Sequence, residues 1–179
     1  MKIVRLFAAC ALVVVPSLLT GCVSSAFKDI RVEAESDPKS NLGAFETYAW
    51  VAAAAAVRDP EGQWSPSNLD VGAEIVRLVD NQLQAAGKAK VNTMPDLLLA
   101  YGVGVDMKAM GVVENKDTGG YRFERIPKGG LMVVFIDPRT GRAIWAGAAE
   151  ADVQENPSSD LVHKRLDYAI TEMFKQAPL

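Results

Sequence analysis

A strand–turn–strand pattern occupies residues 131–153, which read LMVVFIDPRTGRAIWAGAAEADV. Residues 131–136 are continuously apolar, and residues 143–153 return as a second segment rich in apolar side chains. Between these segments, Pro138 and Gly141 stand where a type I turn followed by a left-handed residue needs them. This part of the chain therefore predicts an antiparallel β-hairpin.

Further strands are predicted on the N-terminal side of the hairpin. In residues 96–108, every second residue from Leu97 to Val105 is large and apolar, which is the period of two typical of a strand. Shorter strands are expected at residues 29–35, 45–51 and 121–126.

Two other segments are expected to form long loops. The first of these loops is residues 52–66. Its five alanines could form a helix, but the turn residues at 59–62 would end that helix after one or two turns. Residues 106–120 are polar and contain glycine.

Two amphipathic helices are also predicted. The first begins near Ser67 or Asn68, both favourable N-cap residues, has Asp70 in its first turn and ends at Gly87. The second begins at residues 156–158, where proline suits the first helical position. Their apolar stripes are Ile75, Val76, Val79 and Leu83 in the first, and Val162, Leu166, Ala169, Ile170 and Met173 in the second.

Strands that flank one helix, followed by a meander and a closing helix, predict an α+β fold. We expect an antiparallel or mixed β-sheet with two helices packed on one face. Residues 97–99 and 131–136 place apolar side chains on both faces, although a sheet with one wet face should alternate. The face opposite the helices must then be covered by loops, by a second copy of the protein, or by a partner or apolar ligand.

The first 22 residues indicate the compartment. Lys2 and Arg5 precede about ten apolar residues, as in a secretory signal peptide, and this core is shorter than the roughly 20 residues of a membrane span. Residues 19–22, Leu-Thr-Gly-Cys, resemble the bacterial lipobox, in which diacylglycerol is added to the cysteine and signal peptidase II cuts before it. We expect Cys22 to be the lipidation site, with palmitate among its acyl chains. The alternative is an ordinary signal peptide with an incidental cysteine.

Cleavage before Cys22 defines three parts of the chain. Residues 1–21 are the removed signal peptide, residues 22–29 the lipidated N-terminus and tether, and residues 30–179 a single periplasmic domain. The mature 158 residues contain 17 basic and 22 acidic side chains, a net charge of −5 that argues against nucleic acid as a partner. Because Cys10 leaves with the signal peptide and Cys22 carries lipid, neither a disulfide nor a catalytic thiol is available.

Several sequence blocks carry a family resemblance through their order and spacing. They are the lipobox and residues 45–50 (FETYAW), 95–101 (PDLLLAY), 130–137, 140–141, 144–147 (IWAG) and 149–150. With these blocks, residues 30 to 175 resemble the DUF4136 family of envelope lipoproteins. The resemblance implies a fold and a place in the envelope, and supplies no catalytic residues. The residue after Cys22 is Val23, whereas an aspartate at this position would resemble an inner-membrane retention signal. The implied destination is therefore the periplasmic leaflet of the outer membrane.

Candidate catalytic groups are few. His163, the single histidine, could serve a hydrolase or a zinc site, but it lies off the apolar stripe and no second histidine or free cysteine completes a metal set. Two carboxylates can hydrolyse glycosides, but turn and strand-end roles explain each acidic residue here better. Those on or beside predicted strands are Asp96, Asp106, Asp137, Glu150 and Asp152. Gly102-Val103-Gly104 lies within a predicted strand and lacks the helix that a nucleotide loop requires.

The sequence therefore favours a non-enzymatic binding or structural role in the envelope, with no catalytic, cofactor-binding or metal residue assigned. The alternative is a small periplasmic hydrolase that uses carboxylates, or a serine with His163. Trp50 and Trp145 are expected in the core. Trp64, in a loop, either packs over the start of the first helix or anchors a partner, since tryptophan is enriched at binding hot spots. We expect it at the margin of the face opposite the helices, as a candidate interaction surface for an envelope protein or an apolar ligand.

Overall fold

The computed structural model describes residues 25–58, 64, 68–106, 109–115, 120–153 and 156–179. In this part of the chain, six strands form one mixed sheet in the order β1-β8-β7-β4-β2-β3. Their bounds are β1 Arg31–Ser36, β2 Thr47–Arg58, β3 Ala89–Lys90, β4 Leu97–Asp106, β7 Lys128–Asp137 and β8 Arg142–Asp152. The predicted hairpin is confirmed as β7 and β8, with Gly141 at a φ of 68° in the turn.

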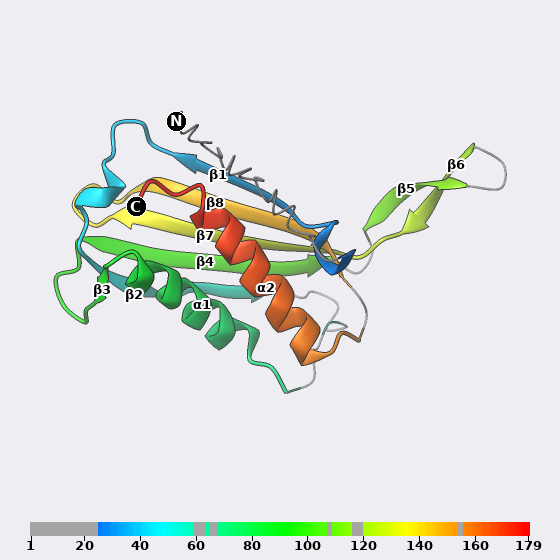
Figure 1. Cartoon of the computed structure of the whole chain (residues 1–179), viewed down its shortest axis with the longest axis horizontal. Helices are drawn as coiled ribbons and strands as arrows, with labels where there is room; N and C mark the ends of the chain where they lie inside the picture. The colour runs from blue at the N-terminus through cyan, green and yellow to red at the C-terminus, as the bar shows by residue number, and fades with distance from the viewer. Residues whose placement is uncertain (1–24, 59–63, 65–67, 107–108, 116–119, 154–155) are drawn as a thin grey trace, which may run out of the picture.

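Helices α1 (Val71–Ala85) and α2 (Ser159–Phe174) lie side by side on one face of the sheet (Figure 1). Their apolar stripes meet the inward side chains of β4 and β7, all of which are buried. These inward residues are Leu97, Leu99, Tyr101, Val103 and Val105 of β4, with Leu131, Val133 and Phe135 of β7. The predicted α+β fold, with a mixed sheet and two helices on one face, is therefore confirmed.

The helix boundaries differ slightly from the prediction at their N-termini. The N-cap of α1 is Asp70, whose carboxylate accepts a hydrogen bond from the Ala73 N–H at 3.0 Å, rather than Ser67 or Asn68. The N-cap of α2 is Ser158, so Pro157 precedes the cap. Gly87 follows α1 with a φ of 81°, as expected of a glycine that ends a helix.

Two of the predicted loops contain strands instead. β2 continues through the alanines to Arg58, because its backbone pairs in parallel with β4 beyond a register shift, from Ala55 opposite Tyr101 to Arg58 opposite Gly104. Alanine has the highest intrinsic helix propensity, but tertiary context overrides propensity, and here the backbone pairing with β4 outweighs it. Residues 106–120 contain β5 (Met110–Asn115), which pairs with β6 (Gly120–Arg125). This hairpin extends away from the main sheet (Figure 1).

Helix α1 is joined to the sheet through Asp80. Its Oδ1 accepts hydrogen bonds from Tyr48 Oη at 3.0 Å and from Trp50 Nε1 at 2.9 Å, while Lys90 Nζ contacts Oδ2 at 2.9 Å. One helical carboxylate thus satisfies two side chains of β2 and one of β3. The pKa of Tyr48 is raised to about 12, chiefly by burial and also by Asp80, while a hydrogen bond from Gln84 lowers it.

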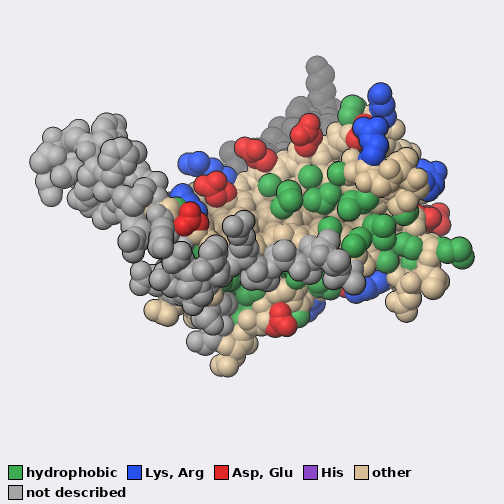
Figure 2. All heavy atoms as spheres, turned by 180° about the vertical axis from the view of Figure 1, so that it is seen from behind, with side chains coloured by type: hydrophobic (Ala, Val, Ile, Leu, Met, Phe, Trp, Pro, Cys, Tyr) green, Lys and Arg blue, Asp and Glu red, His purple; other side chains and the backbone are tan. Residues whose placement is uncertain are grey.

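The face of the sheet opposite the helices carries the apolar side chains that the sequence predicted for it. Figure 2 shows these side chains across the described part of that face, with charged residues beside them. Met132 is 49% exposed. Half-buried neighbours on the same face are Leu98, Ala100, Val134, Ile136 and Ala146.

Candidate functional site

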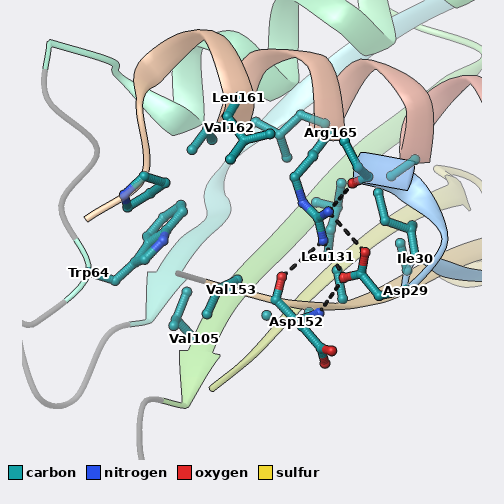
Figure 3. Close-up of a pocket in the computed structure, with 18 of the residues that line it drawn as sticks. Asp29, Ile30, Trp64, Val105, Leu131, Asp152, Val153, Leu161, Val162 and Arg165 are labelled. Atoms are coloured by element: carbon teal, nitrogen blue, oxygen red, sulfur yellow. Dashed lines mark hydrogen bonds and ion pairs between the residues drawn. The ribbon is translucent and has the colours of Figure 1, made fainter. Parts of the chain in front are cut away.

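A cavity of about 440 Å³ lies between α2 and the end of the sheet formed by β4, β7 and β8 (Figure 3). Its walls are mainly apolar. Among the side chains that line it are Val105, Leu131, Val153, Leu161, Val162 and Leu166. Ligand sites in proteins usually have volumes of about 300–1,000 Å³ and apolar walls, so the cavity has the size and chemistry of a small-molecule site.

Small residues on the sheet create this space. Gly129 and Gly130 of β7, with Ala149 and Ala151 of β8, line the sheet side of the cavity, while larger side chains of α2 line the other side. Ala149 faces inward because it pairs with buried Leu131, whereas its neighbour Ala148 pairs with exposed Met132 on the opposite face. Because these sheet residues are small, a space remains between them and α2.

Trp64 lines the cavity and packs against the hydrophobic core. In Figure 3 its ring lies beside Val105 and Val153, near the N-terminal end of α2. The prediction that Trp64 stands at the margin of the face opposite the helices is therefore wrong, because its indole packs on the helix side of the sheet. Trp145, as predicted, is in the core and is 1% exposed.

The polar part of the cavity wall includes Arg165 of α2 and Asp29, which precedes β1. Arg165 Nη1 donates to Asp29 Oδ1 at 3.0 Å, and Nη2 donates both to the other carboxylate oxygen and to the Asp152 carbonyl at 2.9 Å. Nη1 also contacts the carbonyl of Ala26. The Asp152 N–H donates to Asp29 Oδ2 at 2.9 Å. The guanidinium and the carboxylate are thus both engaged within the protein.

The ionised form of Asp29 is favoured despite its partial burial. Burial raises the pKa of Asp29, but the hydrogen bonds from Arg165 and from backbone N–H groups outweigh burial and hold the pKa below its ordinary value. Arg165 is the only cationic side chain among the described residues that line the cavity. Because it is paired with an ionised carboxylate, the described lining residues offer no free positive charge to a ligand.

The segment before β1 is packed against α2. Residues Ser25–Phe27 form the short helix η1, and the ring of Phe27 stacks on Tyr168 with centroids 4.8 Å apart. Ser25, Ala26 and Asp29 line the cavity. The predicted tether at residues 22–29 is therefore too long, since residues 25–29 belong to the packed domain. The predicted lipidation site, Cys22, and the signal peptide lie outside the described residues.

The structure places His163 away from the cavity, between the two helices. Its Nδ1 contacts Glu74 Oε1 of α1, and its side chain is 42% exposed. Glu74 also accepts two hydrogen bonds from Arg77; these lower the pKa of Glu74, as the His163 contact also does, while burial raises it. Among the described hydrogen bonds, none joins His163 to a serine hydroxyl, so the described residues do not form the serine–histidine pair that a hydrolase would need.

The candidate carboxylates are divided between the two ends of the sheet. Asp96 accepts hydrogen bonds from Thr47 at one end, where Asp137 pairs with Arg139. Asp152 and Glu150 contact Lys128 at the other end, where β4 ends with Asp106. Within the described ranges, no three His, Cys, Asp or Glu side chains are grouped to hold a metal ion. Gly102 and Gly104 lie inside β4, as predicted.

The Asp29–Arg165 pair is the feature of the site that the sequence did not reveal. The two residues are separated by 136 positions, and each resembles an ordinary surface charge in its local sequence. An arginine one residue before the predicted apolar Leu166 is the only local sign that α2 has a charged group at its buried edge. No helix in the described part of the chain is long and apolar enough to cross a membrane.

Comparison with known proteins identifies solved structures of similar fold and one matching family. No curated protein matches the chain in sequence. A DUF4136 family protein from Bacteroides thetaiotaomicron is similar, with 11% identity, a TM-score of 0.53 and coverage of 84% of this chain and 96% of that chain. A PDZ domain protein from Parabacteroides distasonis has 17% identity and a TM-score of 0.50 over 84% of this chain. The match covers 35% of that protein, so the chain spans about a third of its length.

A third similar structure is the PelC dodecamer from Paraburkholderia phytofirmans, with 12% identity, a TM-score of 0.47 and coverage of 80% of this chain and 94% of that chain. The family described as "Domain of unknown function (DUF4136)" matches residues 32–179, which include both helices and nearly the whole sheet. The resemblance of the sequence blocks is thereby confirmed, and the chain belongs to the DUF4136 family.

Proposed function

We propose that this protein is a lipoprotein, anchored through Cys22 to the periplasmic side of the outer membrane, whose domain binds an apolar ligand and catalyses no reaction. The observation that carries the binding function is the apolar cavity of about 440 Å³ between α2 and the sheet. Each Å² of apolar ligand surface that the cavity removes from water would contribute about 25 cal/mol to the free energy of binding.

The arrangement of charged groups supports binding over catalysis. General acid–base chemistry needs a titratable group free to exchange a proton with the substrate. In the cavity, Asp29 and Arg165 hold one another, and His163 is engaged with Glu74 outside it. The carboxylates that could pair in a hydrolase are divided between the two ends of the sheet.

The proposed location rests on the sequence. The basic start, the short apolar core and the Leu-Thr-Gly-Cys motif predict lipidation, and Val23 predicts sorting to the outer membrane. Each buried CH₂ of an acyl chain adds about 0.8 kcal/mol to membrane attachment, so two or more chains anchor a protein stably.

Binding of a neutral apolar dye tests the proposed function. The mature chain with Cys22→Ser, exported behind an ordinary secretory signal peptide, carries no lipid that could compete for the cavity. It should enhance the fluorescence of N-phenyl-1-naphthylamine in a saturable manner. Ala149→Phe fills the cavity and should abolish this signal, while the matched Ala148→Phe places the same ring on the opposite face and should leave it unchanged. Equal saturable binding by all three proteins would exclude the cavity as the site.

A further inference from the structure

We infer that the cavity accommodates an acyl chain, and that the chain is one carried by Cys22 of the same molecule. This inference rests on the proposed lipidation and names the ligand of the proposed site. Three properties support it: the distance along the chain from Cys22 to the cavity wall, the charge state of the wall, and the advantage that a tethered ligand has over a free one.

The cavity lies within reach of the predicted anchor. Ser25 lines it and is only three residues after Cys22. Because an extended chain spans at most about 3.3–3.6 Å per residue, Cys22 cannot lie more than about 11 Å from the position of Ser25. The attached acyl chains therefore start within about 11 Å of a residue that lines the cavity.

The wall chemistry selects a chain without a free acid. A fatty acid would bring a carboxylate toward a cavity in which Arg165, the only cation among the described lining residues, is already paired with Asp29. Burying an unpaired charge is costly. The chains on a lipidated cysteine are linked as esters or an amide, so they carry no charge, and their CH₂ groups match the apolar side chains of Leu131, Val162 and Leu166.

Tethering favours the molecule's own chain over a free apolar ligand that is present below millimolar concentration. A ligand attached by a short flexible linker has an effective concentration on the order of millimolar, without any new contact. The bilayer and the cavity are both apolar, so transfer between them changes hydrophobic burial little. Outside the bilayer, a chain in the cavity would avoid exposure to water.

Photocrosslinking of the lipidated protein tests the inference. The full chain would be produced in bacteria fed a palmitate that carries a diazirine, irradiated in membranes, purified and digested. Mass spectrometry should then find the Cys22 peptide joined through its acyl chain to a peptide from α2 or β8, with no added lipid mass. Ala149→Phe should lose this link and Ala148→Phe should keep it. The melting temperature of each variant shows whether it is folded, and the wild-type link stands without either variant.

The other outcomes are distinct. A whole phospholipid attached to α2 or β8, with no link to Cys22, would overturn the inference and leave the cavity as a lipid-binding site. A lipidated Cys22 peptide with no link to α2 or β8, and no lipid on either, would also overturn it. A Cys22 peptide that carries no lipid would refute the proposed anchor, which is a separate failure visible in the same digest.

Discussion

Arg165 binds the carboxylate of Asp29 through both of its terminal nitrogens and so joins the last helix to the segment before the first strand. Their side chains are 19% and 27% exposed. Arg165 also holds two backbone carbonyls, those of Ala26 and Asp152. A single side chain therefore fixes the N-terminal segment against one wall of the cavity.

Replacing Arg165 by methionine should lower the free energy of unfolding by about 1.5–3 kcal/mol, because hydrogen bonds to charged groups are lost and Asp29 is left partly buried without its partner. The control is Lys164→Met in the same helix, which removes an exposed pair with Asp160 and should change stability by less than about 1 kcal/mol. Urea unfolding measures both. Equal losses in the two variants would mean that the Asp29 pair contributes no more than a surface contact.

The contribution of Asp29 should depend on pH. Since the pKa of Asp29 is lower in the folded protein than its ordinary value of 3.8, the folded state binds fewer protons than the unfolded state in this range. Its stabilising contribution is present above about pH 4 and is lost as the pH falls through the folded pKa. The difference in unfolding free energy between wild type and Asp29→Asn should therefore be largest near neutral pH and shrink on acidification. A difference that stays constant down to pH 2 would contradict this.

Tyr48→Phe should be destabilising at neutral pH and less so at high pH. The substitution removes the hydrogen bond to Asp80, worth about 1.5–3 kcal/mol for a charged acceptor. The pKa of Tyr48 is about 12 in the folded protein and near 10 in the unfolded chain. The contribution of Tyr48 to the free energy of unfolding is therefore complete below pH 10 and declines as the pH rises from 10 to 12. Unfolding in urea at pH 7, 10 and 11.5 checks the trend, and a gap that widens with pH would exclude it.

Ile170→Ala should cost about 2–5 kcal/mol, since Ile170 is fully buried and its truncation leaves a hole in the core. Leu166→Ala, one turn earlier, should cost less because Leu166 is only partly buried and already borders the cavity. His163→Ala should cost less than Ile170→Ala, as expected for a side chain that is 42% exposed. Thermal unfolding ranks the three variants. If Leu166→Ala is as damaging as Ile170→Ala, the cavity wall is more tightly packed than the structure indicates.

Cys22→Ser should remove the lipid anchor. The wild-type mature protein should partition into detergent and fractionate with outer-membrane markers, whereas the variant should be released or should retain its signal peptide. Intact-mass analysis of the wild type should show a chain that begins at Cys22 and carries diacylglycerol. A chain with an unmodified Cys22 would refute the lipid anchor. A lipidated chain that fractionates with inner-membrane markers would refute the predicted sorting.

The sequence predicted those elements whose side chains alternate between two environments. β4 was identified because Leu97, Leu99 and Tyr101 are all buried against the helices, so its period of two is complete. β2 is longer than predicted, since an alanine run has no period and its backbone partners in β4 lie 46 positions later. The cavity could not be predicted either, because it depends on small residues such as Ala149 lying opposite α2, and on a charge pair between residues distant in sequence.

The position of β1 at the edge of the sheet has a consequence for folding during the proposed export. β1 pairs with β8, and the paired residues are separated by 109 to 119 positions, from Ser36 opposite Trp145 to Arg31 opposite Glu150. Contacts of such long sequence separation form late, because the intervening loop must close first. A chain that crosses the inner membrane with its N-terminus leading delivers β1 first and its partner strand almost last. If the chain is exported as proposed, the first strand to arrive remains unpaired until nearly the entire domain has been translocated.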